Sequence, residues 1–392
     1  MELTNSLKRQ TAQAAAAGKS RAARGLVVAY SLAAAPNPHD HDHESVTRTG
    51  IAKRLAALKG YDFVGEYDPA ARYPTSVYFV PSHTIIGLDT ARKLGIEDEH
   101  DLFGGVVPHA FVSTKSITHP LFDPAAEAPS GWSHDFCDAV SDAVLPGYTA
   151  FTTRDARRAG RKLLERGAVR VKPALAIGGR GQTVARDAAA LDAAIDAVDA
   201  GELRLCGVAL EQSLSEVVTY SVGRVSVGAW EATYFGTQKL TADHDGAQVY
   251  GGSDLVVARG DFDALLTLAV PTDAQLAIAR ARTYDAAAGA CFPGLIASRR
   301  NYDVVLGLDE SGERRCGVLE QSWRIGGASG PEVAALEAFR DDPGLMAVRA
   351  SCVEIYGDAE APPGATVYFD GIDEKVGRLV KYTVTGAHVD EG

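Results

Sequence analysis

Cysteine is scarce in this sequence, and no two cysteines have the spacing of a structural site. The five cysteines are spread between Cys137 and Cys352, and none belongs to a C-x-x-C motif. An odd and scattered set of this kind excludes a disulfide framework as the basis of the fold and provides no structural zinc site. We therefore expect a protein of a reducing compartment, the cytoplasm.

Long hydrophobic runs are also missing, because no stretch of 18 apolar residues occurs. A membrane-spanning helix is therefore not expected. Basic residues between Lys8 and Arg24 precede an apolar run at 25–35, an arrangement that loosely resembles a secretory signal. We favour the alternative that residues 25–30 form the first buried strand of the fold and that residues 1–24 are a flexible tail.

Positive charge is outweighed by negative charge. There are 39 lysines and arginines against 51 aspartates and glutamates, which gives a net charge of -12. This balance disfavours a surface that neutralises many phosphates, so no nucleic-acid partner is expected. The hydrophobic fraction of 46% is that of a soluble globular protein, and 392 residues are too many for one core. Two or three packed units are expected.

The N-terminal part shows an alternating pattern. Apolar runs at 25–30, 76–80 and 105–107 have the length of buried strands, and a helical pattern at 45–58 separates the first two. This order predicts an α/β unit with a largely parallel sheet over residues 25–115. A proline-containing connector at 118–131 follows it.

Residues 116–392 contain a second series of elements. Thr152-Thr153 and Asp187 are helix-capping residues, so each predicts a helix that begins directly after it. The predicted elements are a helix from Thr153 that stops at Gly167, a strand at 168–172, a helix at 188–198 closed at Gly201, two β-rich runs within 207–230, a helix at 272–292, a hairpin at 302–321, a helix at 331–340, and strands near 365–369 and 379–384.

A glycine-rich loop follows a lysine at the end of a predicted strand. Lys172 ends the strand, and Gly178, Gly179 and Gly181 follow, so the ammonium and exposed backbone N–H groups can converge on a polyphosphate. Neither the P-loop spacing nor the G-x-G-x-x-G fingerprint of dinucleotide-binding proteins is present. From the spacing alone, a phosphate site and an ordinary turn both remain open.

A hairpin near the C-terminus carries two carboxylates. Taking Ser311-Gly312 as a two-residue turn makes Asp303 face Glu320 and Asn301 face Ser322, all on one side of the sheet. Two carboxylates whose Cβ atoms are roughly 5 Å apart need a cation beside them, and Mg²⁺ is the natural candidate. The alternative is a register slipped by one residue, which leaves solvated charges on an exposed face.

The order of these features resembles the ATP-grasp superfamily over roughly residues 115–339. The resemblance implies that Lys115 and Lys172 bind ATP phosphates and that Gly178, Gly179 and Gly181 belong to a lid loop. It also implies further nucleotide or substrate contacts, namely Glu211 and Leu214 at the adenine, Glu216 at the ribose, and Lys239 at the γ-phosphate or substrate.

The same resemblance identifies Asp303 and Glu320 as the magnesium ligands and Arg324 as the residue that holds the transferring phosphoryl group or the acyl substrate. One position departs from the family pattern, because the family has an asparagine ligand where this chain has Ser322. Either Asn301 or the Ser322 hydroxyl is then expected to supply the missing oxygen. The number of metal ions is open for the same reason.

The fold implied is an N-terminal pre-ATP-grasp domain, 25–115, followed by a two-lobed ATP-grasp domain, 116–392, with a lid lobe at about 148–212. The implied reaction uses ATP and Mg²⁺ to activate a carboxylate as an acyl phosphate, which an amine or a similar nucleophile attacks. The sequence lacks the bicarbonate-binding pattern of biotin carboxylases, so carboxylate–amine ligation is the wider expectation. The expected partners are small molecules, and a homodimer is the expected assembly.

Two other functions stay open at this point. The departure at Ser322 favours an ATP-binding regulatory module without turnover, and the N-terminal unit allows a nicotinamide oxidoreductase, although the glycine fingerprint is absent. The tract from His39 to Glu44 is expected to be solvated or to cap the next helix, with transition-metal binding or a role of His43 or Glu44 at the substrate as the alternatives.

Overall fold

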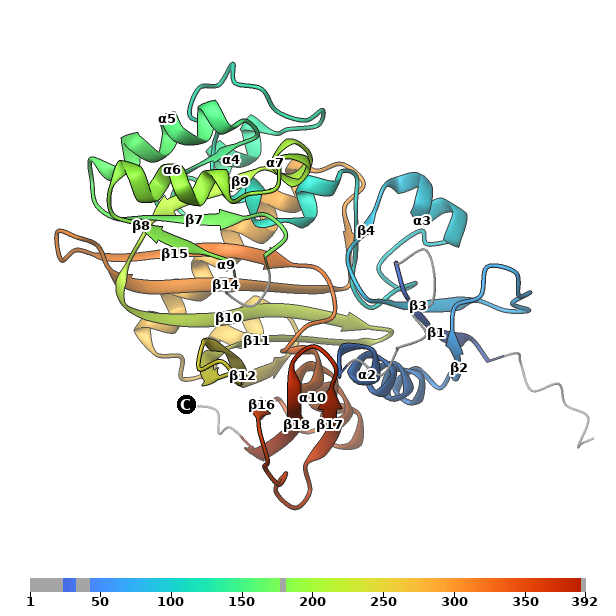
Figure 1. The fold of residues 1–392 in the computed structure, drawn as a ribbon. Helices are drawn as coiled ribbons and strands as arrows, with labels where there is room; N and C mark the ends of the chain where they lie inside the picture. Colours follow the sequence, from blue (N-terminus) through green and yellow to red (C-terminus); the bar gives the residue numbers. More distant parts are fainter. Residues whose placement is uncertain (1–23, 33–42, 177–180, 389–392) are drawn as a thin grey trace, which may run out of the picture.

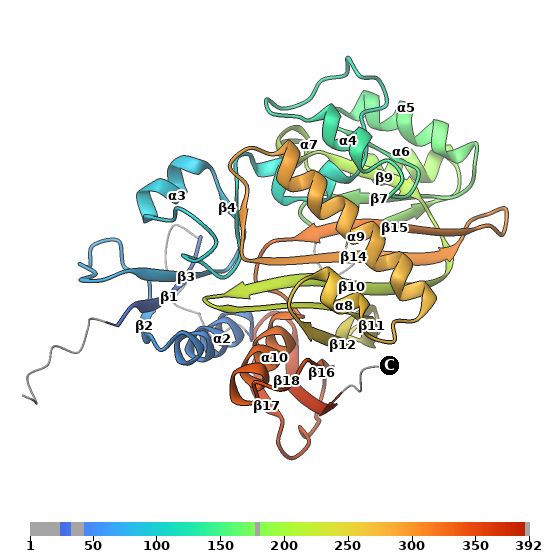
Figure 2. The same ribbon diagram turned by 180° about the vertical axis from the view of Figure 1, so that it is seen from behind.

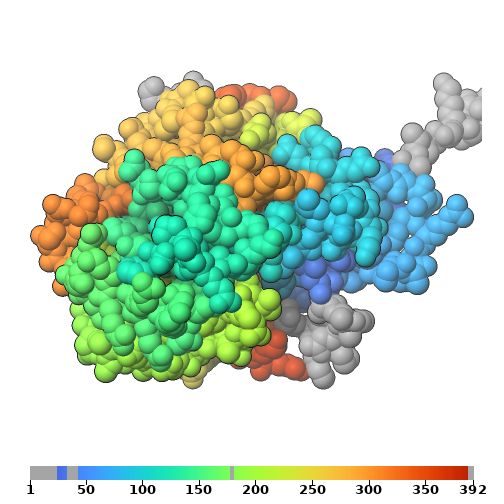
Figure 3. All heavy atoms as spheres, turned by 90° about the horizontal axis from the view of Figure 1, so that it is seen from above, coloured from blue at the N-terminus to red at the C-terminus, as the bar shows by residue number. Residues whose placement is uncertain are grey.

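The computed structural model describes residues 24–32, 43–176 and 181–388. Figure 1 shows a large central sheet, a smaller sheet with its helices above it, and an N-terminal unit at one side. Seen from above, the N-terminal unit is a separate mass that adjoins the rest along one flank (Figure 3). None of the helices in these ranges combines the length and apolar character needed to cross a membrane.

The N-terminal unit is built on a parallel sheet. Strand β1 (Leu26–Tyr30) lies between β2 (Asp62–Glu66) and β3 (Val77–Pro81), and both pairings are parallel. Helix α2 (His43–Lys59) packs against β1. The central residues of β1 are fully buried, which explains the continuous apolar run. The predicted parallel sheet is confirmed. The unit also holds β4 (Ile85–Ile86), α3 (Leu88–Leu94) and β5 (Gly105–Val107), and β5 pairs with β13 (Ile296–Ala297).

A four-stranded antiparallel sheet forms the upper lobe in Figure 1, with its helices on the outer side. The predicted caps are confirmed, because Thr152 Oγ1 accepts a hydrogen bond from Asp155 N and Asp187 accepts one from Ala190 N. One boundary was wrong: Asp199 caps a further helix, so Gly201 lies inside that helix. The elements are β6 (Gly147–Ala150), α5 (Thr153–Leu164), β7 (Val169–Pro173), β8 (Thr183–Ala185), α6 (Ala188–Asp196), α7 (Ala200–Cys206) and β9 (Val208–Gln212), in the sheet order β6-β9-β7-β8.

The central sheet has eight strands and is antiparallel throughout. Figure 2 shows α9 (Thr272–Cys291) lying across its rear face, whereas α10 (Ser329–Asp341) packs on the opposite face. The strands, in spatial order, are β15 (Arg314–Ser322), β14 (Arg299–Leu308), β10 (Ser215–Val227), β11 (Trp230–Ala242), β12 (Gln248–Arg259), β16 (Ala347–Tyr356), β18 (Gly377–His388) and β17 (Thr366–Asp373).

Short helices connect these layers. They are the 3-10 helices η1 (Ala110–Ser113) and η2 (Lys115–Thr118), and the α-helices α4 (His134–Ala139) and α8 (Phe262–Leu266). The two faces of β14 have different roles. Tyr302 points to the rear face, where its hydroxyl donates to Asp285 of α9. Its neighbour Asp303 therefore points to the opposite face, because side chains alternate along a strand.

The β14–β15 hairpin reaches the predicted pairing by a different route. Asp303 pairs with Glu320 and Asn301 with Ser322, as expected. The two-residue turn was wrong, because Leu308 pairs with Arg314 around a five-residue loop, 309–313, in which Gly312 has φ +81°. A β-bulge at Leu319 inserts one extra residue and restores the predicted register.

Candidate functional site

A fully buried lysine joins the four-stranded sheet to the central sheet. Lys172 Nζ of β7 lies 3.1 and 3.2 Å from the two carboxylate oxygens of Glu211 in β9. The same ammonium donates to the carbonyl oxygen of Leu319 at 2.9 Å. Because Leu319 is the bulged residue of β15, the bulge turns a backbone carbonyl away from the strand ladder and toward the lysine.

Glu211 has a second partner that the sequence did not reveal. His119 Nε2 lies 3.1 Å from Glu211 Oε2, and both side chains are almost completely buried. Burial alone would raise the pKa of the Glu211 carboxyl, but the charge of Lys172 and the hydrogen bond from His119 lower this pKa to about 2. Glu211 is therefore an ionised and fully compensated carboxylate. The only sequence signal for His119 is its position four residues after Lys115.

Lys115 approaches the same place from η2. Its Nζ lies 2.9 Å from Glu320 Oε2, and the lysine side chain is 2% exposed. The ammonium also donates to the carbonyl oxygen of Ala176 at 2.5 Å, at the start of the glycine-rich loop. The two predicted lysines thus both contact β15, Lys115 at Glu320 and Lys172 at the Leu319 carbonyl.

The two predicted metal-binding carboxylates face one another across β14 and β15. Asp303 Oδ1 lies 2.8 Å from Gln238 Nε2 and 2.9 Å from the side-chain amide of Asn301. Burial and the charge of Glu320 raise the pKa of Asp303 to about 6. Burial acts in the same direction on Glu320, but Lys115 and then Lys172 outweigh it and lower the pKa of that carboxyl. The pair therefore lacks positive charge on the Asp303 side.

Behind this pair lies a buried polar network. Arg299 Nε lies 3.0 and 2.9 Å from the carboxylate oxygens of Glu332 in α10. The Tyr234 hydroxyl lies 2.6 Å from Glu332 Oε1 and 2.9 Å from the side-chain amide of Asn301. Arg299, Tyr234 and Glu332 are at most 1% exposed. No pattern in the sequence indicates this network, because its members come from β11, β14 and α10 and meet only in the folded chain.

Arg324 lies where the central sheet meets the N-terminal unit. Its Nη1 donates to the Ile325 carbonyl at 2.8 Å, and it forms no ion pair with a carboxylate of the described residues. Burial and the charge of Arg299 lower the pKa of this guanidinium. Burial, Arg324 and Arg48 also lower the pKa of His83, which ends the loop after β3. Arg324 is therefore a cation whose charge is available to a ligand.

Lys239 is not brought to the cluster. It is about half exposed and forms an ion pair with Asp254. Its neighbour Gln238 points to the other face of β11 and contacts both Asp303 and Ser221, so Gln238 is the residue of this strand that reaches the site. The resemblance implied the adjacent residue, Lys239, and the strand β11 itself was not predicted from the sequence.

Leu214 and Glu216 lie at the junction of β9 and β10. Ser215 between them pairs with Leu308, which is five residues along β14 from Asp303. At about 3.3 Å per residue the junction lies roughly 16 Å from the carboxylate pair. Glu216 is exposed and has φ 49°. Both residues therefore lie beside the same strand as the metal-binding candidates, at its other end.

The predicted glycines, the histidine tract and Ser322 need separate mention. Gly178 and Gly179 lie outside the described residues, as do positions 39–42 of the histidine tract. Gly181 is described and has φ +71°, a conformation that favours glycine. The Ser322 hydroxyl lies 3.5 Å from Arg299 Nη1, so it faces a guanidinium.

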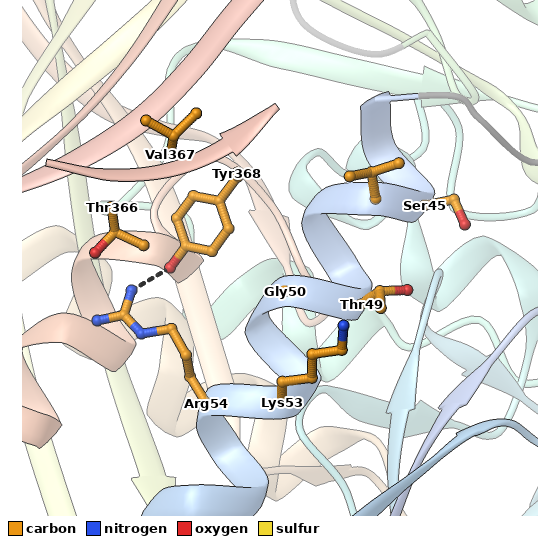
Figure 4. A pocket seen from close by; sticks show the side chains of 9 residues that line it. Ser45, Thr49, Gly50, Lys53, Arg54, Thr366, Val367 and Tyr368 are labelled. Atoms are coloured by element: carbon orange, nitrogen blue, oxygen red, sulfur yellow. Dashed lines mark hydrogen bonds between the residues drawn. The ribbon is translucent and has the colours of Figure 1, made fainter. Parts of the chain in front are cut away.

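A cavity of about 490 Å³ occurs elsewhere, between α2 and β17. Figure 4 shows Ser45, Thr49 and Lys53 along one side of α2, and Arg54 hydrogen-bonded to Tyr368 of β17. Arg54 also contacts Glu337 of α10, so its charge is compensated. The cavity shares no residue with the lysine and carboxylate cluster. Within the described ranges no group of three or more histidine, cysteine or acidic side chains converges, so a metal here relies on Asp303, Glu320 and neutral oxygens.

Comparisons with known proteins bear on the family and the fold. A family described as "Protein of unknown function (DUF3182)" matches residues 31–383. The fold is similar to that of phosphoribosylamine–glycine ligase from Thermotoga maritima, with 14% identity, 92% of each chain covered and a TM-score of 0.51. It is also similar to N5-carboxyaminoimidazole synthetase from Staphylococcus aureus complexed with ADP, with 9% identity, 93% of this chain and 94% of that chain covered and a TM-score of 0.51. No curated protein matches. Both solved structures are ATP-grasp ligases, so the predicted ATP-grasp fold is confirmed.

Proposed function

Because the chain belongs to the DUF3182 family and has an ATP-grasp fold, we propose that it is an ATP-dependent ligase. In this proposal it activates a carboxylate as an acyl phosphate, which an amine or a similar nucleophile then attacks. The observation that carries the proposal is one cluster, in which Lys115 and Lys172 lie against the strand that holds Glu320 opposite Asp303. Its substrates are small molecules, and the cytoplasm is the compartment that fits the unpaired cysteines.

Lys115 and Lys172 are proposed to bind the ATP phosphates. All three protons of the Lys172 ammonium have partners, namely the two Glu211 oxygens and the Leu319 carbonyl. Phosphate binding therefore exchanges one of these contacts for a charge-assisted hydrogen bond. Gly178, Gly179 and Gly181 are proposed to cover the phosphates as part of a lid lobe at about 148–212, and Glu211, Leu214 and Glu216 are proposed to line the adenosine end.

The residues fit a magnesium ion. Asp303 and Glu320 are two facing carboxylates, and Asp303 contacts neutral amides while Lys115 lies at Glu320, which supports a cation on the Asp303 side. Hard oxygen ligands of this kind, completed by phosphate oxygens, are what Mg²⁺ prefers. When bound, the ion neutralises charge on the β- and γ-phosphates. Ser322 and Asn301 are the neutral oxygens available beside the pair.

In this reaction the side chains mainly position the reactants and neutralise negative charge. A substrate carboxylate oxygen attacks the γ-phosphorus, the bond from that phosphorus to the β-bridging oxygen breaks, and ADP leaves. The nucleophile then adds to the acyl carbon, loses a proton and expels inorganic phosphate. Arg324, with no carboxylate partner among the described residues, is proposed to hold the substrate carboxylate or the transferring group. Lys115 and Lys172 stabilise the negative charge of the phosphates.

The test is incubation of the chain with ATP, Mg²⁺ and pools of carboxylic acids and amines, with ADP and phosphate as the products measured. We expect ADP in selected pools only, and loss of ADP in the variant Arg324→Gln. Arg92→Gln is the matched control, because Arg92 is an exposed arginine of α3 paired only with its neighbour Asp89.

A second function is favoured by one residue, Ser322, which replaces a metal-binding asparagine of the superfamily pattern. It is an ATP-binding regulatory module without turnover. A rise in melting temperature with ATP and Mg²⁺ and no ADP in any pool supports this function instead. The absence of any such rise contradicts both.

A further inference from the structure

Four polar side chains form a row of short contacts that ends at the carboxylate pair. Asp303 Oδ1 lies 2.9 Å from the amide of Asn301, that amide lies 2.9 Å from the Tyr234 hydroxyl, and the hydroxyl lies 2.6 Å from Glu332 Oε1. Asn301 is 8% exposed, and Tyr234 and Glu332 are 0% exposed. Water therefore does not reach the contacts of Tyr234 with Glu332 and Asn301, and these side chains have to satisfy one another, whereas Asp303 is partly exposed.

The row has more acceptors than donors. Its three contacts need three protons, but the tyrosine hydroxyl supplies one and the asparagine NH₂ group can face only one of its two neighbours. Asp303 and Glu332 are carboxylates and supply none. Whichever way the amide is turned, one contact joins two oxygens with no hydrogen between them.

The two orientations of the amide differ in which contact of the row lacks a hydrogen. Oxygen and nitrogen of an amide occupy nearly the same positions, so the partners decide the orientation. In the structure the amide nitrogen faces Asp303 and the amide oxygen faces the Tyr234 hydroxyl, so the contact without a hydrogen is one of the two that Tyr234 makes, with Glu332 or with Asn301. That place is fully buried. No cation can enter there, and Arg299 is already engaged with Glu332 through Nε.

With the amide reversed, both contacts at the buried end of the row become hydrogen bonds. The Tyr234 hydroxyl donates to Glu332 at 2.6 Å, the strongest acceptor in reach, and accepts a hydrogen bond from the Asn301 NH₂ group at 2.9 Å. The contact that lacks a hydrogen is then the one between the Asn301 and Asp303 oxygens. That place opens toward the carboxylate pair, where a cation can enter.

We propose that the side-chain oxygen of Asn301 is a ligand of the divalent cation beside Asp303, and that Tyr234 and Glu332 are positioning residues that turn this oxygen toward the metal. The inference rests on the proposed function, because it assumes a cation at the Asp303–Glu320 pair. Two neighbouring ligands of an octahedral Mg²⁺ with bonds of 2.0 to 2.1 Å are about 2.9 Å apart. The atoms of Asn301 and Asp303 are 2.9 Å apart.

Ser322 is the less suitable ligand. Arg299 Nη1 lies 3.3 Å from the Ser322 carbonyl oxygen and 3.5 Å from its hydroxyl. A guanidinium at this distance repels a second cation and uses the lone pairs that a metal requires. The oxygen that the metal-binding strand lacks at Ser322 is thus supplied by the residue opposite it in the hairpin, Asn301.

The test measures binding of Mn²⁺, which reports by electron paramagnetic resonance, to the full chain with a non-hydrolysable ATP analogue. We expect Asn301→Leu to weaken Mn²⁺ binding by about tenfold or more, and Asn301→Asp, which keeps an oxygen there, to restore it. Tyr234→Phe removes the acceptor that holds the amide, so it is expected to weaken Mn²⁺ binding several-fold although Tyr234 touches no metal. Gln248→Leu, an exposed amide of β12, is the matched control and is expected to bind normally.

The outcomes separate this inference from the proposed function. If Glu320→Gln abolishes Mn²⁺ binding but Asn301→Leu binds normally, Asn301 is not a ligand and only this inference is overturned. If Ser322→Ala weakens binding as Asn301→Leu is expected to, the ligand assignment is reversed. If Glu320→Gln and Lys172→Met both bind Mn²⁺ and the nucleotide analogue like the unmodified chain, the proposed function itself is wrong. Melting curves without metal show whether each variant is folded.

Discussion

The two sheets that face each other across the site treat their carboxylates in opposite ways. On the four-stranded sheet, Glu211 lies against Lys172 and His119, and the pKa of Glu211 is lowered to about 2. On the central sheet, Asp303 lies against Glu320, and the pKa of Asp303 is raised to about 6. Burial acts in the same direction on both carboxyls, so the partners decide the difference. The carboxylate of the smaller sheet has a buried ammonium as its partner, whereas Asp303 of the central sheet contacts neutral amides and faces a second carboxylate.

The largest expected loss of stability comes from removing the ammonium that neutralises Glu211. Lys172→Met leaves the carboxylate of Glu211 buried without its ammonium, so we expect the free energy of unfolding to fall by about 3 to 5 kcal/mol. Chemical denaturation measures this change. The double variant Lys172→Met with Glu211→Leu removes both charges and is expected to recover much of the loss while still failing to bind ATP. Equal stability of the single and double variants would show that Glu211 does not depend on Lys172.

A smaller effect is expected at the second partner of Glu211. His119→Leu removes one hydrogen bond to a buried carboxylate, which is expected to cost about 1 to 3 kcal/mol. His119→Gln keeps an N–H donor and is expected to recover part of this stability. A glycine faces the ring, since a Cβ at Gly147 would lie 2.6 Å from His119 Nδ1. If glutamine and leucine destabilise equally, the packing of the ring rather than its hydrogen bond is what matters.

The contributions of Asp303 and Glu211 to stability are expected to respond to pH in opposite senses. The lowered pKa of Glu211 means that its contribution to stability is present above its ordinary value of 4.5 and is lost as pH falls toward 2. The pKa of Asp303 is raised from 3.8 to about 6, so the native state binds the extra proton and loses stability as pH rises through this range.

We therefore expect metal-free Asp303→Asn to be more stable than the unmodified chain at pH 7, by about 1 kcal/mol after allowance for partial exposure, and no more stable at pH 4. Melting temperatures across this range measure the difference. Saturating Mg²⁺ with an ATP analogue is expected to reverse the order, because only the unmodified chain keeps the metal-binding carboxylate. A gain in stability that does not depend on pH would contradict the raised pKa.

The smallest effect is expected at Lys239, which lies away from the lysine and carboxylate cluster. Lys239→Met breaks an ion pair with Asp254 in which both side chains are about half exposed. Pairs of this kind contribute little, so the unfolding free energy is expected to change by less than about 0.5 kcal/mol and ATP affinity to stay the same. Gln238→Leu, one residue away, removes a donor to Asp303 and is expected to alter metal binding. A loss of ATP binding in Lys239→Met would return that lysine to the site.

Local signals in the sequence predicted much of the framework. Capping residues such as Thr152 and Asp187 fix where helices begin, because their side chains bond to the first backbone N–H groups of the same helix. The strands β11, β12 and β16 of the central sheet were not predicted. Their pattern depends on which face each residue buries against neighbours from distant parts of the chain, and that is not a local property.

The hairpin shows how a correct pairing can rest on an incomplete reason. The turn at Gly312 displaces the register by one residue, and the bulge at Leu319 displaces it back. A bulge has no reliable sequence signal, yet this one places the Leu319 carbonyl on Lys172. The sequence analysis missed several polar residues for a related reason, because the role of each depends on a partner that it meets only in the folded chain. They are Gln238, His119 and the Arg299–Glu332 pair.

The sequence by itself indicated which charged residues to expect at the candidate site. Lys172 ends a predicted strand and Asp303 faces Glu320 in the predicted hairpin, and the resemblance to the ATP-grasp superfamily added Lys115 and Glu211. Only the tertiary structure decided how those charges are shared. Lys172 neutralises Glu211 and Lys115 lies against Glu320, whereas Asp303 contacts the neutral amides of Asn301 and Gln238. Electrostatic interaction depends on distance in space and on the surrounding medium, and neither is written in the spacing of residues along the chain.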